Sequence, residues 1–464
     1  MDTRMVELGF VPEPERDCTG APIPLSDATI QERLDKVVER MRARGLDALV
    51  VYGDVEHAGN FAYLAGFFTR FEEGLLVIAA DGSACFVLGN ENRDKADKAR
   101  IDARVVHAPI LSLPNQPQAP SAPLPSALRE AGVQPGMRVG LAGWKLFTAE
   151  DVDASSTFDV PAFIVDALRE AAGSDGALVN ATGIFIGADG ARTANSANEV
   201  AHYEFGAALA SDCMLDAMDA LGAGVSEMRL GDTLVRHGQH TSVVTIAASG
   251  PRFVQANMFP TANRVKWGDP VALTVGYAGG LSSRAGFAVS TSAEMPREQA
   301  DWLEKVAAPY FAAYVRWLER IRVGMTGGEL FDEVERVLPR ATYGWSLCPG
   351  HLTAEEEWLC SPVYEGSDEV LTSGMIFQID IIPSVPGYGG VSAESTVALA
   401  DEGLKRDIRS RYPGMWERME RRRAYITEVL GIALSPDVLP MCSTVAYLRP
   451  YLLNHRQAFS MQRM

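Results

Sequence analysis

Short apolar runs limit what this chain can fold into. Several in the first half have the length of a strand, among them LDALVVY at 46–52 and GLLVIAA at 74–80. Each is far shorter than the roughly 20 residues that a bilayer-spanning helix needs. Segments of helical period lie between or beside them, such as the one that follows the N-cap candidate Ser26 and ends at Gly45. Strands that alternate with helices predict a small α/β domain.

The second half has a different order of elements. A Gly- and Ala-rich passage at 173–191 precedes it, and a long helical pattern then begins near Ser196. Helix, helix, strand and strand follow one another twice, which predicts an α+β domain with helices packed on an antiparallel sheet. Since 464 residues exceed what one core usually organises, we expect an N-terminal domain at 1–180, a second domain at 181–410 and a helical extension at 411–464.

The charge balance narrows the classes of partner. Lys and Arg number 42 against 60 Asp and Glu, which gives a formal net charge of -18. Such a field repels nucleic-acid phosphates and anionic membranes, so we expect neither as a partner. The first residues are acidic and lack an apolar signal core, which favours a cytoplasmic protein. The six cysteines show no C-x-x-C spacing, and the sequence therefore predicts neither a disulfide framework nor a zinc cluster.

Four segments carry a family resemblance, in order along both halves of the chain. They are YLAGF, ASGPRFVQANMFPTANRVKWGDPVALTVG, CPGHLTAEEEW and SGMIFQIDIIPSVPGYGGVSAESTVAL, within a span from about residue 27 to about residue 403. Together they resemble the creatinase/prolidase or pita-bread superfamily, which includes Xaa-Pro aminopeptidases, prolidases, methionine aminopeptidases and creatinase. The resemblance implies an α/β N-terminal creatinase-like domain followed by an α+β pita-bread domain that holds the catalytic centre.

The resemblance also implies where a metal centre would lie. Metal-dependent members hold two dications with two aspartates, one histidine and two glutamates. In this chain those positions fall on Thr274 and, with a one-residue gap, Arg284, then on His351, Asp380 and Glu394. Two dications would bring four positive charges to two surviving carboxylates, and Arg284 would add a fifth. We therefore expect a pocket without metal or other cofactor, although one ion held by the histidine and the two acids stays chemically possible.

Two interpretations of Arg284 remain open. It can pair with Asp380 or Glu394 where a metal stood and offer a fixed cation to an anionic substrate group, or it can only neutralise buried carboxylates. We count it with Thr274 among the substrate-binding candidates. His351, Asp380 and Glu394 are the catalytic candidates, because two acids in one site push their pKa values apart. The alternative for His351 is a satisfied core residue.

Further candidates for substrate contacts lie outside these positions. Metal-dependent relatives commonly place a histidine where this chain has Asn257, and the position of a second expected histidine is Trp358. The stretch FFTRFEEGLLVI resembles the segment with which creatinase-type dimers reach the neighbouring subunit's pocket. That implies a homodimer in which Phe68 and Arg70 contact substrate; an ordinary solvated arginine is the alternative. The acidic run at 355–357 is expected to face solvent.

Three functions follow from the residues and the resemblance. The first is a metal-independent, creatinase-like hydrolase that acts on a C–N bond of a small nitrogenous, carboxylate-bearing compound, with water activated by Glu394 or His351. The second is a metallopeptidase of the Xaa-Pro aminopeptidase or prolidase type with a reduced one-metal site. The third is a non-catalytic binding protein, or a biosynthetic enzyme with a reassigned reaction, because a fold does not fix its function.

Overall fold

The computed structural model describes residues 6–116, 122–254 and 259–462. The chain divides into two compact units, one formed by Leu25–Thr193 and the other by Met1–Pro24 together with Ala194–Met464. These bounds differ from the expected 1–180, 181–410 and 411–464. The first 24 residues and the last sixty belong to the same unit, because the two ends of the chain pair with each other as described below.

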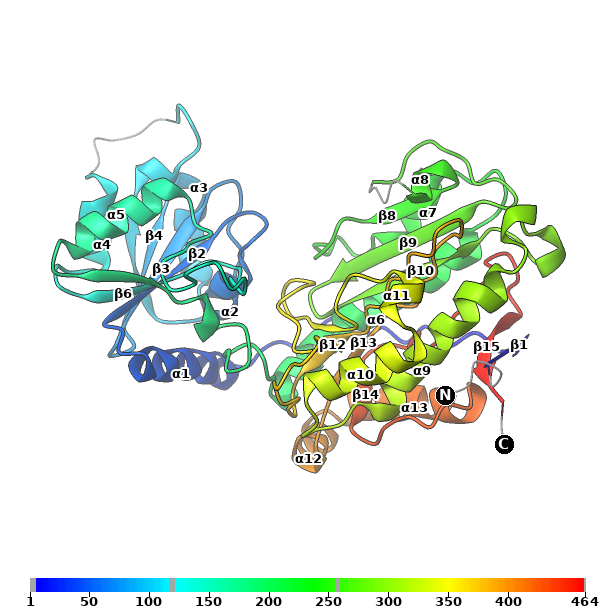
Figure 1. The fold of residues 1–464 in the computed structure, drawn as a ribbon. Coiled ribbons are helices and arrows are strands. Elements are labelled where there is room, and N and C mark those ends of the chain that lie inside the picture. Colours follow the sequence, from blue (N-terminus) through cyan, green and yellow to red (C-terminus); the bar gives the residue numbers. More distant parts are fainter. Residues whose placement is uncertain (1–5, 117–121, 255–258, 463–464) are drawn as a thin grey trace. The chain divides into compact units, whose positions relative to one another are not determined.

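The N-terminal unit contains one six-stranded sheet in the order β5-β4-β3-β2-β6-β7 (Figure 1). Strand β3 runs antiparallel to both of its neighbours, and the remaining neighbours are parallel. Helices α4 and α5 contribute to the apolar core that includes residues of these strands. The mixed sheet with its helices confirms the predicted α/β domain. The elements are α1 (Asp27–Ala43), β2 (Ala48–Gly53), α2 (Gly59–Ala65), β3 (Gly74–Ala79), β4 (Ala84–Leu88), α3 (Asn90–Arg93), β5 (Ala103–His107), α4 (Leu124–Ala131), β6 (Arg138–Ala142), α5 (Ala162–Ala172) and β7 (Ala177–Asn180).

The C-terminal unit combines helices with two larger antiparallel sheets and one two-stranded pair, which confirms the predicted α+β class. One sheet has the order β10-β9-β8 and the other β11-β12-β13-β14, and a bridge between Ala285 and Ser392 joins β10 to the segment that precedes β13. Helix α6 packs against β9 and β10, and α9 packs against α10. The elements are α6 (Ala197–Ala220), α7 (Glu227–Leu234), β8 (Ile246–Ser249), α8 (Pro251–Val254), β9 (Pro270–Tyr277), β10 (Gly280–Phe287), α9 (Ala308–Arg320), α10 (Gly327–Val337), α11 (Arg340–Tyr343), β11 (His351–Leu352), β12 (Ile376–Gln378), β13 (Thr396–Leu399), α12 (Glu402–Arg411), α13 (Pro413–Ala424) and β14 (Val438–Pro440).

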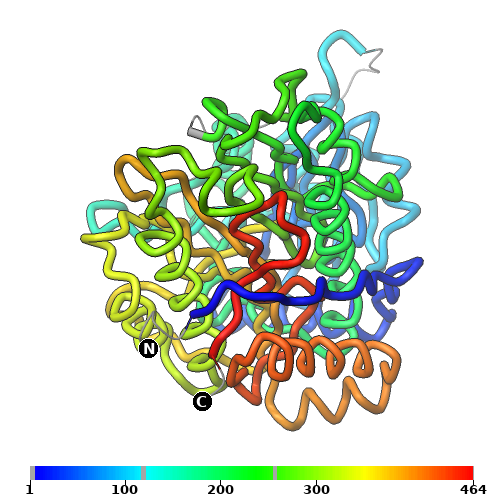
Figure 2. The backbone as a smooth tube through the Cα atoms, turned by 90° about the vertical axis from the view of Figure 1, so that its right-hand side faces the viewer, coloured from blue at the N-terminus to red at the C-terminus, as the bar shows by residue number. Residues whose placement is uncertain are grey.

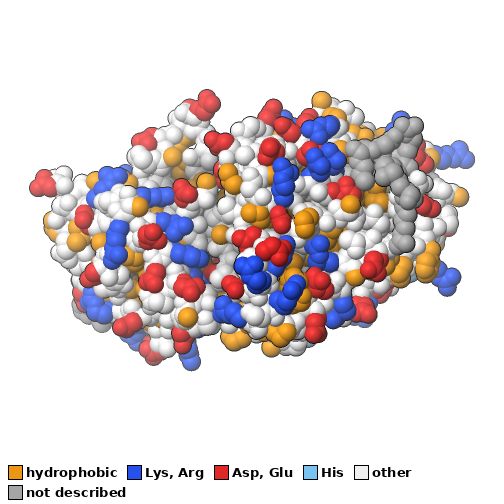
Figure 3. Space-filling view, turned by 90° about the horizontal axis from the view of Figure 1, so that it is seen from below, with side chains coloured by type: hydrophobic (Ala, Val, Ile, Leu, Met, Phe, Trp, Pro, Cys, Tyr) orange, Lys and Arg blue, Asp and Glu red, His pale blue; other side chains and the backbone are white. Residues whose placement is uncertain are grey.

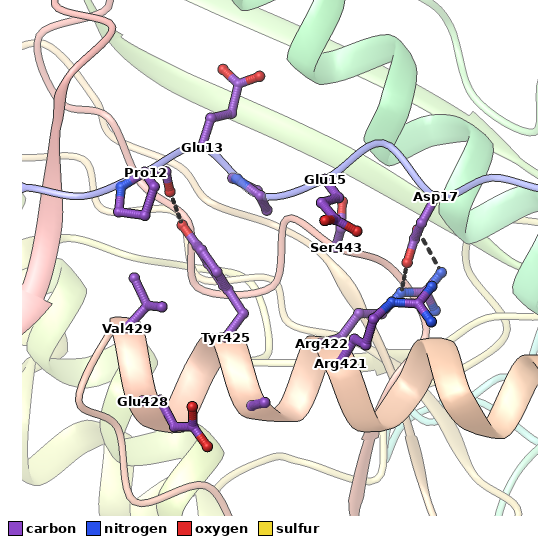
Figure 4. A pocket seen from close by; sticks show the side chains of 12 residues that line it. Pro12, Glu13, Glu15, Asp17, Arg421, Arg422, Tyr425, Glu428, Val429 and Ser443 are labelled. Atoms are coloured by element: carbon purple, nitrogen blue, oxygen red, sulfur yellow. Dashed lines mark hydrogen bonds and ion pairs between the residues drawn. The ribbon is translucent and has the colours of Figure 1, made fainter.

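The two ends of the chain are joined side by side in this unit. Strand β1 (Val6–Phe10) pairs antiparallel with β15 (Gln457–Met461). Figure 2 shows the N-terminal and C-terminal segments, blue and red, meeting on one side of this unit. Farther along, the Asp17 carboxylate accepts two hydrogen bonds of 2.7 Å from Arg422 of α13 (Figure 4). The Tyr425 hydroxyl donates to the Pro12 carbonyl at 2.7 Å, and a cavity of about 370 Å³ remains between the two segments. The last sixty residues are therefore an integral layer of the C-terminal unit and not a separate extension.

The surface carries charges of both signs. On the face shown in Figure 3, acidic and basic side chains intermingle, with hydrophobic side chains scattered among them. Within the described ranges, no helix combines the length and the apolar character that crossing a membrane requires. The exclusion of nucleic acid as a partner and the cytoplasmic location stay predictions.

Acid should weaken the packing between α6 and α13. Glu204 is buried and accepts hydrogen bonds of 2.9 and 2.8 Å from Arg418, and Arg422 lies 2.8 Å from its Oε1 atom. Burial raises the pKa of Glu204, but the charges of Arg422 and Arg418 outweigh it and hold that pKa below the usual 4.5. A carboxyl group with a lowered folded pKa adds stability above its unfolded pKa, and this stability is lost as the pH falls through the folded pKa.

We therefore expect the free energy of unfolding to fall as the pH drops below about 4.5, and to fall less steeply in Glu204→Gln. Urea unfolding at a series of pH values measures both slopes. Glu417 is an exposed acid of α13, the helix that carries the two arginine partners of Glu204. Glu417→Gln is therefore the matched control and should keep the slope of the unmodified chain. Equal slopes in Glu204→Gln and in the unmodified chain would contradict the assignment.

Candidate active site

Two hydroxyl groups face each other at and beside the strand positions where the resemblance implied aspartates. Thr274 of β9 pairs with Ser283 of β10, and the Thr274 Oγ1 atom donates to Ser283 Oγ at 3.0 Å. Ser392 Oγ donates to the same Ser283 oxygen at 3.2 Å. The structure thus places Ser283, and not Arg284, opposite Thr274. Side chains alternate between the two faces of a strand, so Arg284 points to the other face of the sheet.

Arg284 is engaged in full by the protein. Its side chain is 0% exposed, and its donors reach five acceptors, none of which is a carboxylate. They are the Tyr447 carbonyl at 2.9 Å, the Ser283 and Glu394 carbonyls at 2.7 Å each, Ser395 Oγ at 3.2 Å and the Thr444 carbonyl at 2.5 Å. The expected pairing of Arg284 with a substrate anion is corrected, because all five of its donors reach neutral oxygens of the protein. Burial raises the pKa of the Glu394 carboxyl group, and the charge of Arg284 opposes that rise, as the second interpretation expected, although no ion pair joins the two side chains within the described residues.

His351 begins β11 and is 0% exposed. Its Nε2 atom lies 3.0 Å from Glu357 Oε1 and 3.9 Å from Asp380 Oδ2, although its orientation does not give a well-aligned hydrogen bond to either. Burial lowers the pKa of His351, but the Glu357 carboxylate, followed by Asp380, outweighs burial and raises that pKa above 6.5. The two nearby acids favour the protonated form of the imidazole. A histidine with a purely structural role in the core does not require two acidic neighbours.

Asp380 and Glu394 form a buried carboxyl pair, 6% and 8% exposed. Each group affects the titration of the other, and Asp380 Oδ1 has no hydrogen-bond partner within the described part of the chain. Burial and the neighbouring Asp380 carboxylate raise the pKa of Glu394 well above 4.5, and burial raises that of Asp380, against the opposing effect of His351. Two neighbouring buried acids oppose each other's ionisation, and the stronger rise at Glu394 makes it the member that holds a proton more readily.

Sequence reasoning missed two residues of this cluster. Glu357 was expected to face solvent, yet it turns to His351, and Ser283 was passed over in favour of Arg284. The Ala-Gly-Gly stretch at 278–280 could have indicated a tight hairpin turn. In the structure Tyr277 pairs with Gly280 across a two-residue turn of Ala278 and Gly279, and this register sets Ser283 opposite Thr274. No comparable signal marked Glu357, because the loop at 353–359 has no period.

The other sequence candidates have separate places. Trp358 stacks on His351 with ring centres 4.0 Å apart and is 40% exposed, so it covers the imidazole. Asn257 lies outside the described residues. Phe68 and Arg70 belong to the N-terminal unit, where the guanidinium lies 5.6 Å from the Phe68 ring centre and donates to the Val55 carbonyl. The role of Phe68 and Arg70 in substrate binding across a homodimer stays a prediction.

Comparison with known proteins covers both units. Residues 33–186 match the family described as the creatinase/prolidase N-terminal domain, and residues 192–401 match metallopeptidase family M24. The chain belongs to the creatinase/prolidase superfamily. The pita-bread fold implied by the four sequence segments is thereby confirmed.

Relatives within the superfamily include two Xaa-Pro dipeptidases. The protein from Lactobacillus helveticus is 24% identical over 200 residues, which cover 40% of this chain and 52% of that protein. The one from Lactobacillus delbrueckii subsp. lactis is 25% identical over 186 residues, which cover 39% of this chain and 49% of that protein. This chain thus spans about half the length of the curated relatives it matches.

Solved structures of similar fold cover more of the chain. The prolidase from Thermococcus sibiricus has a TM-score of 0.63 at 17% identity, over 80% of this chain and 95% of that one. The Xaa-Pro dipeptidase from Bacillus anthracis has a TM-score of 0.60 at 19% identity, over 80% and 96%. Zinc-substituted aminopeptidase P from E. coli has a TM-score of 0.56 at 16% identity, over 81% and 93%. At these identities the likeness establishes the fold alone.

The family description implies metal, and the donor set can be tested against it. Of the five ligand positions that the resemblance implies, Thr274 bonds to the Ser283 hydroxyl, and Arg284 donates to neutral oxygens on the other face of the sheet. Neutral hydroxyl groups and a guanidinium are poor ligands for dications, which prefer ionised carboxylates and neutral imidazole. Throughout the described ranges, no three His, Cys, Asp or Glu side chains come together as a metal-ligand group. The residues present therefore fit neither the two-metal centre nor the reduced one-metal site.

Proposed function

We propose that this chain is a hydrolase that cleaves the C–N bond of a small peptide-like amide, with Xaa-Pro dipeptides as the reference substrates. The observation that carries the proposal is the buried pair Asp380 and Glu394 beside His351, within the segment that matches a peptidase family. Both curated relatives are named for Xaa-Pro dipeptides. They support an amide substrate over the creatine-like compound that we expected first.

The carboxyl pair supplies the acid and the base of amide hydrolysis. Ionised Asp380 takes a proton from water as the water oxygen bonds to the carbonyl carbon. Protonated Glu394 gives its proton to the leaving nitrogen as the C–N bond breaks, so protons and electrons balance. The cationic His351, held by Glu357, stabilises the negative charge that develops on the carbonyl oxygen. This role was expected of Arg284, which has no free donor.

The carboxylate on the substrate was part of the first expectation because Arg284, and Arg70 across a dimer interface, were expected to bind it. With Arg284 committed to backbone carbonyls, nothing among the described residues of the cluster supports that feature. A purely binding role remains the second candidate. It is favoured by one observation, the hydroxyl pair Thr274 and Ser283 at and beside the inherited ligand positions.

Direct turnover assays separate these functions. The purified chain is incubated with Leu-Pro, with the reversed dipeptide Pro-Leu as matched control, and with creatine, each in the presence of a chelator and again with added Mn²⁺. We expect release of free leucine and proline from Leu-Pro, with or without chelator, and no turnover of creatine. Turnover of creatine would return the proposal to the creatinase-like reading. Loss of all amide hydrolysis under every condition would favour the binding protein.

A further inference from the structure

A cavity of about 600 Å³ lies beside the polar cluster in the C-terminal unit, and Ser283 and Ser392 form part of its wall. Its floor is a row of small side chains. Ala272 of β9 pairs with Ala248 of β8 on one side and with Ala285 of β10 on the other, so three alanines stand in line across the sheet. The alanine row is two residues, about 7 Å, along the strands from the row of Thr274 and Ser283.

The rest of the lining includes large apolar side chains and is held in place. Phe253, Ile382 and Tyr388 contribute its large side chains. The Tyr388 hydroxyl donates to Asp301 at 2.8 Å, and Gly389 is fixed from both sides: its N–H donates to Gln299 at 2.6 Å and its carbonyl accepts from Trp302 at 2.8 Å. A wall anchored in this way is formed before a ligand arrives, which lowers the entropy cost of binding.

The chemistry of the lining is one-sided. Among its described residues none is Asp, Glu, Lys, Arg or His, and the polar groups are serine hydroxyls, the Gln299 amide and the Tyr388 hydroxyl. A charged group that entered would leave water without gaining an opposite charge, which is costly. A hydrophobic group of suitable size would lose only its contact with water, which is favourable. The volume suits a small-molecule site lined by apolar side chains with a few polar groups.

We infer that this cavity binds the side chain next to the scissile bond and selects an uncharged, apolar group, branched aliphatic or aromatic. The position next to a cleaved bond rests on the proposed function, whereas the preference for an apolar group depends only on the lining of the cavity. It narrows the substrate class to amides of hydrophobic residues and excludes acidic and basic residues at that position. Ala272, at the centre of the floor, is the residue that sets the available depth.

Binding of three matched probes tests the inference without turnover. They are N-acetyl-leucine methylamide, N-acetyl-glutamate methylamide and N-acetyl-lysine methylamide, each titrated calorimetrically into the unmodified chain. We expect the neutral probe to bind at least about tenfold more tightly than either charged one. Equal affinities, or tighter binding of a charged probe, would overturn the inference. This comparison needs no variant, so a folding defect cannot obscure it.

Two variants locate the binding. Ala272→Phe should fill the floor and abolish binding of the neutral probe, and Ala272→Asp should reverse the order so that the lysine probe binds best. Ala341→Phe, at an exposed alanine of α11, is the matched control and should bind as the unmodified chain does. Neutral binding that survives Ala272→Phe would place the site elsewhere. If the probes bind as expected while no amide is hydrolysed, the cavity inference stands and the hydrolase proposal fails. If amides are hydrolysed while the three probes bind equally, the hydrolase proposal stands and the cavity inference fails.

Discussion

Replacing Arg284 by methionine should lower the free energy of unfolding by about 3–5 kcal/mol. Methionine keeps much of the volume but donates no hydrogen bond, so four buried carbonyl groups and the Ser395 hydroxyl each lose a donor at once. The Glu394 and Thr444 carbonyls keep other donors, so the main loss falls on the Tyr447 and Ser283 carbonyls. Each unsatisfied buried acceptor costs about 1–3 kcal/mol, and the losses are not fully additive. Urea unfolding followed by circular dichroism measures the change.

The control is Arg421→Met, which removes an exposed guanidinium of α13 and should change stability by less than about 0.5 kcal/mol. The result also decides between two roles. A structural Arg284 predicts a large loss of stability, and any folded fraction should keep the KM of the unmodified chain. If stability were unchanged while KM rose strongly, Arg284 would contact substrate and its assignment as a structural residue would be wrong.

Neutralising either member of the carboxyl pair should reduce kcat by about 10²–10⁴-fold. Asp380→Asn removes the base, and Glu394→Gln removes the proton that the leaving nitrogen receives. Both substitutions preserve shape, and both take away a carboxyl group that is costly to bury, so we expect the melting temperature to fall little. Steady-state kinetics on a hydrolysed dipeptide, with thermal unfolding of the same samples, measures both quantities.

Glu417→Gln again serves as the matched acid-to-amide control and should leave kcat unchanged. We also expect the double variant Asp380→Asn, Glu394→Gln to have a kcat only slightly below that of the less active single variant, because the two acids act as one unit. Full activity in either single variant would remove the pair from the reaction.

Fold and family could be predicted from sequence because they depend on patterns repeated along the chain. Strand-length apolar runs, the N-cap at Ser26, whose Oγ accepts from Thr29 N at 3.1 Å, and the order of segments in the second half each correspond to a described element. The pairing of β1 with β15 could not be predicted in this way, because strands some 450 residues apart leave no local trace of their partnership.

The site was predictable in its members but not in their contacts. His351, Asp380 and Glu394 do lie together, whereas Arg284 differs by one residue from the position that faces them. A shift of one residue along a strand moves a side chain to the opposite face of the sheet. The resemblance needed a one-residue gap in the hairpin of β9 and β10, so it could not establish which of Ser283 and Arg284 faces Thr274. The charge of Glu357 predicted an exposed side chain. Its position beside the buried His351 imidazole depends on the fold and leaves no pattern in the sequence.

The central claim is that the inherited ligand positions and their neighbours now hold a hydroxyl pair and a buried carboxyl pair in place of bridging ions. The most direct test is an anomalous difference map from crystals of the full chain grown with Mn²⁺. The account predicts no pair of ions within coordinating distance of His351, Asp380 and Glu394, and Thr274 and Ser283 hydroxyls bonded to each other. Two ordered manganese ions bridged by these acids would contradict it.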